Sequence, residues 1–110
     1  MAGQNALMDK QAWSGYTAMS DEALAVTTNA VGFTAATFNP TTAKPALMAV
    51  FTNGAQPVRW ASASDPTSTA GHYLAALGEI VIFEPEIADI KFIRDTSATA
   101  TSTGHVTFYR

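Results

Sequence analysis

The feature that most constrains the fold is a series of short apolar or alternating segments, separated by turn-forming residues about every ten positions. Segments of this length match β-strands, and the regular spacing of the turns is typical of a β-sandwich or barrel. No stretch carries the long 3.6-residue period of an amphipathic helix. We therefore predict an all-β fold: a small antiparallel β-sandwich, jelly-roll or Greek-key-like, with an N-terminal arm.

Two segments carry most of the information about the core. Ala46–Thr52 is apolar at both alternating sets of positions, which is typical of a central strand covered on both faces. The Asn53-Gly54 pair that follows is the strongest short signal for a hairpin turn, here leading to a strand at Val58–Ala61. The large residues expected in the core of the sandwich are Leu24, Phe33, Val50, Trp60, Ile82, Phe92 and Phe108.

The first twenty residues differ from the rest, because isolated large side chains stand among Gly, Gln, Asn and Ser. A length of 110 residues suits one domain, so we divide the chain into an arm at 1–20 and a sandwich at 21–110. Ala6–Trp13 could form a short helix with Asn5 as its N-cap. The arm is expected to cross a subunit boundary. The alternatives are a frayed terminus or packing on its own domain. The candidate interface residues are Leu7, Met8, Trp13 and Tyr16.

Composition excludes several classes of function. The chain has no cysteine, so disulfides, thiol nucleophiles and cysteine-ligated zinc are absent. Its net charge is −3 and its basic residues are scattered, which argues against a nucleic-acid partner. No run approaches the roughly 20 apolar residues of a membrane span, and because Asp9 and Lys10 interrupt the apolar residues of the N-terminal segment, we expect no secretory signal there. Only 14% of residues are charged, which fits either a surface covered by other protein or simply a neutral β-domain.

The titratable residues do not form a catalytic pattern. His72 and His105 are 33 positions apart, no G-x-S-x-G elbow occurs, and no His-x-His pair supports a metal-binding cupin site. The carboxylates of the second half are Glu79, Glu84, Glu86, Asp89 and Asp95. They could serve glycoside hydrolysis or hold calcium, but their spacing favours charges that keep the ends of an apolar strand in water. We expect no enzyme, no cofactor and no metal.

Aromatic residues leave one binding function open. Stacking of sugars on exposed rings would make the chain a carbohydrate- or ligand-binding module, although aromatic side chains more often belong to a core or a subunit interface. The rings in question are Trp13, Tyr16, Trp60, Tyr73 and Tyr109.

A resemblance covers the chain from about Thr27 to Arg110. Its residues, in order, are Val31-Gly32-Phe33-Thr34, Pro57-Val58-Arg59-Trp60, Pro66-Thr67, Gly71-His72-Tyr73-Leu74, Gly78-Glu79, Phe92-Ile93-Arg94 and Val106-Thr107-Phe108-Tyr109-Arg110. This order of strand ends and turns resembles small β-domain structural proteins of tailed-bacteriophage virions. The pattern contains no catalytic motif, so it carries over no functional residue.

The resemblance implies a virion part made in the host cytoplasm. The expected function is that of a capsid decoration (cement) protein, which binds the major capsid protein or another virion protein and stabilises the assembled head. A tail or neck component is the alternative within the same class. We further expect a homo-oligomer, with a trimer as the first expectation, since small structural subunits assemble symmetrically.

Overall fold

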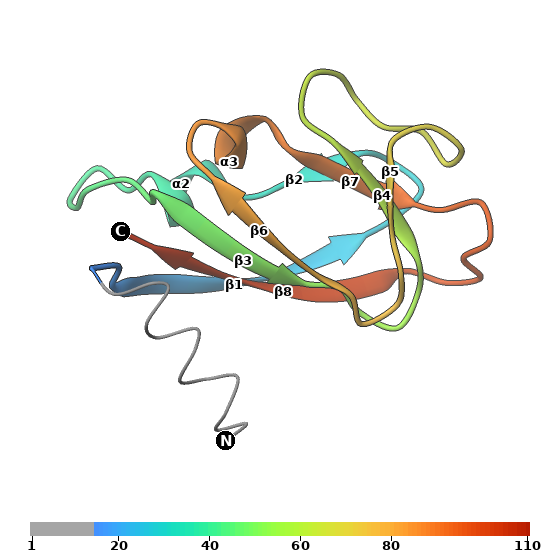
Figure 1. Cartoon of the computed structure of the whole chain (residues 1–110), viewed down its shortest axis with the longest axis horizontal. Coiled ribbons are helices and arrows are strands. Elements are labelled where there is room, and N and C mark those ends of the chain that lie inside the picture. Colours follow the sequence, from blue (N-terminus) through green and yellow to red (C-terminus); the bar gives the residue numbers. More distant parts are fainter. Residues whose placement is uncertain (1–14) are drawn as a thin grey trace.

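The computed structural model describes residues 15–110, which form two four-stranded antiparallel sheets packed face to face (Figure 1). The order of the first sheet is β1-β8-β3-β6, and that of the second is β2-β7-β4-β5. The strands are β1 (Ala18–Val26), β2 (Val31–Gly32), β3 (Met48–Thr52), β4 (Val58–Ala61), β5 (His72–Leu74), β6 (Glu79–Phe83), β7 (Lys91–Arg94) and β8 (Ser102–Tyr109). Two single-turn helices, α2 (Ala35–Phe38) and α3 (Glu86–Asp89), lie between strands. The expected all-β sandwich is confirmed.

The strand pairing follows a nested pattern. β1 pairs with β8, β2 with β7, β3 with β6 and β4 with β5, all antiparallel. Such nesting arises when one long antiparallel hairpin is rolled up, so that alternate pairs fall into opposite sheets. This arrangement of eight strands is the topology of a jelly roll, one of the two forms expected from the sequence.

The alternation of β8 shows how sequence places residues inside and outside. Ser102, Gly104, Val106 and Phe108 are buried, while the residues between them are exposed or half-buried. A period of two is the geometry of a strand with one face on the core. The fully buried rings of Phe51 and Phe92 lie 4.5 Å apart between centroids, and they join the two sheets.

Most of the expected core residues lie in the core. Leu24, Ile82, Phe92 and Phe108 are buried, and Phe33 and Trp60 are half-buried against them. Val50 was predicted wrongly. It lies on the outer side of β3, opposite Val81 on β6, whereas its neighbours Ala49 and Phe51 are in the core. Because β3 is apolar on both faces, its sequence does not indicate which face meets the second sheet.

The hairpin expected at Asn53-Gly54 is also wrong. β3 and β4 belong to different sheets, so the chain crosses the sandwich here. The Asn53 side chain is buried, and its amide donates to the carbonyls of Gln56 (2.8 Å) and Ala75 (3.0 Å). A Cβ on Gly54 would lie 2.4 Å from the carbonyl oxygen of Thr103, which leaves room only for glycine. Asn53 and Gly54 therefore link distant segments through hydrogen bonds and close packing, and they do not form a tight turn.

The N-terminal boundary lies earlier than expected. β1 begins at Ala18, and Thr17 already exchanges two backbone hydrogen bonds with Arg110, at 2.7 and 2.9 Å. The last four residues of the expected arm, 17–20, therefore belong to the sandwich. Tyr16 is 36% exposed. Leu7, Met8, Trp13 and the helix expected at Ala6–Trp13 lie outside the described residues.

Candidate functional site

The two histidines do not meet. His72 lies on β5 with its ring 4.4 Å from that of Trp60, and His105 lies on β8 in the other sheet. Within residues 15–110, no carboxylate forms a hydrogen bond or ion pair with either imidazole, so these residues form no His–carboxylate pair of the kind found in a catalytic triad. In the same range, no group of three or more His, Asp or Glu side chains is placed to hold a metal ion.

Asp95 is the most strongly held carboxylate among the described residues. Its Oδ1 accepts a hydrogen bond from Arg59 Nε at 2.7 Å, and its Oδ2 accepts from the Ser97 hydroxyl at 2.6 Å and the Ser97 N–H at 2.9 Å. The hydrogen bonds from Ser97, followed by Arg59, lower the pKa of Asp95 to about 2. Both oxygens are occupied, so this carboxylate fixes loop structure and is poorly placed to act as a base.

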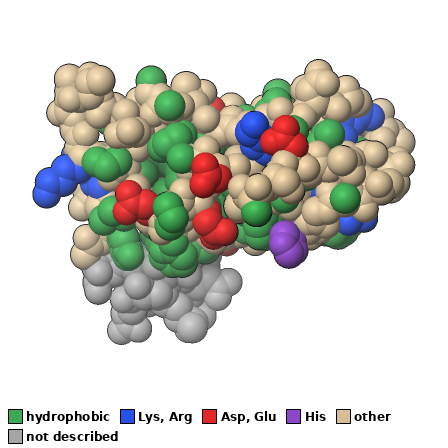
Figure 2. All heavy atoms as spheres, turned by 90° about the horizontal axis from the view of Figure 1, so that it is seen from above, with side chains coloured by type: hydrophobic (Ala, Val, Ile, Leu, Met, Phe, Trp, Pro, Cys, Tyr) green, Lys and Arg blue, Asp and Glu red, His purple; other side chains and the backbone are tan. Residues whose placement is uncertain are grey.

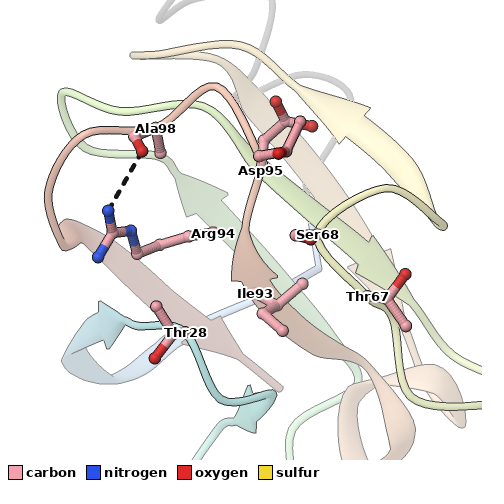
Figure 3. A pocket seen from close by; sticks show the side chains of 8 residues that line it. Thr28, Thr67, Ser68, Ile93, Arg94, Asp95 and Ala98 are labelled. Carbon is pink, nitrogen blue, oxygen red and sulfur yellow. Dashed lines mark hydrogen bonds between the residues drawn. The ribbon is translucent and has the colours of Figure 1, made fainter.

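A polar hollow of about 430 Å³ lies beside Asp95 (Figure 3). Its lining residues are Thr28, Thr67, Ser68, Ile93, Arg94, Asp95, Thr96 and Ala98. The guanidinium of Arg94 donates to the carbonyl of Ala98 at 3.2 Å, which the dashed line in Figure 3 marks. Hydroxyl groups and a guanidinium can bind a small polar molecule, and the hollow is within the usual size range of ligand pockets.

The aromatic residues considered as a sugar platform are dispersed. Tyr73 on β5 is 55% exposed and lies near the guanidinium of Arg59, 5.7 Å from ring centroid to Cζ. Trp60 is packed against the core, and Tyr109 is on β8 in the opposite sheet. Trp13 is outside the described residues. The described rings therefore do not form one flat surface.

An exposed apolar surface lies on the outer side of the first sheet. Val81 and Phe83 on β6 are 41% and 51% exposed, and Val50 on β3 lies beside Val81, half-buried. We call these three residues the β6 patch. Figure 2, seen from above Figure 1, shows acidic side chains standing among hydrophobic ones. An exposed group of large apolar residues is typical of a protein-binding surface.

The sequence of β6 is itself unusual for a strand with one exposed face. The run Ile80-Val81-Ile82-Phe83 is apolar at every position, which suits a strand covered on both faces. In the structure the two faces differ, because Ile82 is buried between the sheets whereas Val81 and Phe83, on the other face of β6, are exposed. Exposed apolar residues beside a free strand edge are typical of interaction surfaces.

Comparisons with known proteins add no relative. No protein-family model matches the chain, and neither a curated protein nor a solved structure matches it. In the part of the chain that the structure describes, no helix is long and apolar enough to cross a membrane. The function must therefore be argued from the sandwich and its surfaces.

Proposed function

We propose that this chain is a non-enzymatic structural protein of a tailed-bacteriophage particle, which binds the assembled head as a decoration (cement) protein. The observation that carries the proposal is the β6 patch, an exposed apolar surface on a sandwich whose described residues bring no catalytic set together. The resemblance of residues 27–110 to virion β-domains supplies the class of partner. Jelly rolls occur in viral capsid proteins, but also in lectins, so the fold agrees with the proposal without deciding it.

The physical basis of such a function is mass action. A protein that binds the assembled lattice, and not the free subunits, stabilises the lattice by the free energy of its binding. This requires a surface for protein contact and no chemistry. In this proposal the partner is the major capsid protein or another virion protein, the chain is made in the host cytoplasm, and it works in the virion as a homo-oligomer, with a trimer expected first.

The decisive experiment mixes the purified chain with phage heads that lack it. We expect saturable binding to assembled heads, little binding to free capsid subunits, and a higher temperature of head disruption. Cryo-electron microscopy of the decorated head would locate the copies and show their symmetry. Ordered copies found only at the neck or tail would move the protein to that part of the virion, and absence from every particle would contradict the proposal.

A matched pair of variants tests the surface. Phe83→Ser removes a large side chain from the β6 patch, while Tyr73→Ser removes one of similar exposure from the second sheet. Truncating a central interface residue often costs about 2 kcal/mol or more of binding free energy. We expect Phe83→Ser to weaken head binding and Tyr73→Ser to leave it unchanged. Equal effects would show that the β6 patch is not the contact.

The polar hollow beside Asp95 favours a second candidate, a module that binds a small polar ligand such as a glycan. Its hydroxyl groups come from the three loops that follow β1, β4 and β7, and loops are a usual place for binding residues. Titration of the chain with a panel of glycans, followed by NMR, would test it. Saturable shifts of the Ser68 and Thr96 amides would favour this candidate over the decoration protein.

A further inference from the structure

The outer edge of β6 has backbone groups that form no hydrogen bond with any residue in the part of the chain that the structure describes. β6 ends its sheet, with β3 as its only strand neighbour in residues 15–110. The residues on either side of β6 bond to those on either side of β3: Asn53 N–H donates to the Gly78 carbonyl at 2.7 Å, and Glu84 N–H donates to the Leu47 carbonyl at 3.0 Å. Backbone groups alternate in direction along an antiparallel strand. Those of residues 79, 81 and 83 therefore point away from β3.

The same alternation puts apolar side chains beside the free edge. Val81 and Phe83 have their side chains on the outer face and their free N–H and C=O groups along the edge. A strand added here would form backbone hydrogen bonds with β6. Apolar side chains of that strand could pack beside Val81 and Phe83 and so enlarge the β6 patch. The edge at β1 offers less, because its outward positions include Asp21, Ala23 and Ala25. Of the two edges of this sheet, β6 is the better acceptor.

Charge decides what kind of strand fits. Glu79, Glu84 and Glu86 surround this edge, and within residues 15–110 none of them forms an ion pair. Glu79 has only a hydrogen bond from the Thr52 hydroxyl at 3.2 Å. Two copies paired through β6 would bring both sets of carboxylates to one junction, where like charges repel. A partner strand with basic ends would instead neutralise them.

We propose that the β6 edge binds an extended segment of a partner protein, which adds as a further strand, carries apolar residues at alternate positions and has Lys or Arg at its ends. This is β-strand addition, in which main-chain hydrogen bonds supply affinity and alternate side chains supply specificity. The proposal stands independently of the virion assignment, because it rests only on the edge, the β6 patch and the carboxylates.

The test uses the full chain and a defined probe. The probe is a synthetic peptide in which Val alternates with Thr between pairs of Lys, and the control peptide has Glu in place of Lys. In an NMR titration, we expect the Lys peptide to shift the amides of Val81 and Phe83 saturably and the Glu peptide to bind at least about tenfold more weakly. Added salt should weaken binding of the Lys peptide, since salt screens the attraction between exposed charges.

Variants of the chain separate the edge from its charges. Val81→Pro removes an N–H that bonds to nothing among the described residues, and proline is tolerated at such edge positions. This variant should keep the fold intact and lower the affinity for the Lys peptide about tenfold. Glu79→Gln combined with Glu84→Gln should weaken binding of the Lys peptide at low salt. Asp65→Asn should not, because Asp65 pairs with Lys91 on β7 of the second sheet.

Several outcomes would overturn the proposal. Equal binding of both peptides, shifts that map away from residues 79–83, or no saturation at millimolar peptide would each do so. If Val81→Pro fails to fold, the Lys peptide N-methylated at alternate residues replaces it, and unchanged binding of that peptide would exclude strand addition. Self-association that Val81→Pro abolishes, without binding of the Lys peptide, would assign the edge to a second copy.

Discussion

The hydroxyl of Ser102 donates a hydrogen bond to Asn53 Oδ1 across 2.8 Å, although 49 positions separate the two residues. Both side chains are buried, and they link the end of β3 to the first residue of β8. Asn53 Oδ1 also accepts from the Gly54 N–H at 2.8 Å, while the Asn53 amide serves the carbonyls of Gln56 and Ala75. One buried side chain therefore satisfies the polar groups of three segments where the chain changes sheets.

Replacing Asn53 by alanine should destabilise the domain strongly. The variant leaves several buried donors and acceptors without partners, and each unsatisfied group costs about 1–3 kcal/mol. We expect the free energy of unfolding to fall by about 2–4 kcal/mol, measured by urea denaturation. Asn29→Ala is the control, because Asn29 is exposed and its side chain forms no hydrogen bond within the described residues. A loss below about 0.5 kcal/mol at Asn53 would contradict this role.

Sequence reasoning recovered the class of fold because strand periodicity is a local property. The buried alternation of Val106 and Phe108, and the core positions of Ile82 and Phe92, follow from it directly. The sheet that each strand joins depends on contacts between distant residues, so the local Asn53-Gly54 pattern predicts a hairpin that does not form. Which face of β3 meets the core also depends on contacts between distant residues, and for this reason the prediction that Val50 lies in the core is wrong.

The candidate site was less predictable for a related reason. An apolar run such as Ile80–Phe83 has the same sequence whether its second face is covered by its own chain or exposed for a partner. Only the tertiary structure distinguishes the two cases, because it buries Ile82 and leaves Val81 and Phe83 exposed. The hollow beside Asp95 likewise combines Thr28 with residues some 40 to 70 positions later, which no local pattern indicates.

The corrected orientation of β3 predicts unequal effects of two neighbouring substitutions. Phe51→Ala removes a fully buried ring that contacts Phe92, and should cost about 3–5 kcal/mol of the free energy of unfolding. Val50→Ala removes two methyl groups on the outer face and should cost about 1 kcal/mol or less. Chemical denaturation of both variants measures the difference. Equal losses would mean that the two faces of β3 are equally buried.

Gly104 should not accept any side chain. A Cβ at this position would lie 2.3 Å from the Phe51 ring and 2.8 Å from the Thr52 carbonyl oxygen. Since both neighbours are held within the sheet and core, Gly104→Ala must displace them, and overpacking of this kind costs about 1–3 kcal/mol. Thermal unfolding should show a lower Tm than that of Gly15→Ala, whose Cβ meets nothing within 4 Å, although its positive φ adds some strain there. A Tm equal to the wild-type value would contradict this packing.

Stability should depend on the charge of Asp95 at acid pH. The pKa of Asp95 is lowered from 3.8 to about 2 in the folded chain, first by the hydrogen bonds from Ser97 and then by Arg59. A lowered pKa stabilises the fold above the unfolded value, and this contribution is lost as pH falls through the folded value. The difference in free energy of unfolding between wild type and Asp95→Asn should be constant above about pH 5 and shrink between about pH 4 and 2.

The control for this measurement is Asp65→Asn, which removes an exposed carboxylate that pairs with Lys91 at 3.2 Å. Its difference from wild type should be small throughout, because exposed ion pairs contribute at most about 1 kcal/mol. Urea denaturation at a series of pH values gives both differences. A difference for Asp95→Asn that stays unchanged down to about pH 2 would show that the hydrogen bonds do not favour the ionised form.

Removal of the first fourteen residues should separate folding from assembly. The eight strands that the structure describes form both sheets from residues 15–110, and the backbone pair between Thr17 and Arg110 closes the sandwich next to Tyr16. We therefore expect the chain shortened to residues 15–110 to keep its circular dichroism spectrum.

The same deletion should weaken assembly. Because the sequence predicts that Leu7, Met8 and Trp13 are interface anchors, oligomerisation or head binding should weaken at least about tenfold, which equals about 1.4 kcal/mol. Trp13→Ala alone should reproduce much of this loss, while Gln4→Ala, a polar change in the same segment, should not. Sedimentation of the free chain and binding to heads measure both effects. Unfolding of the shortened chain would instead make this segment part of the core of its own protomer.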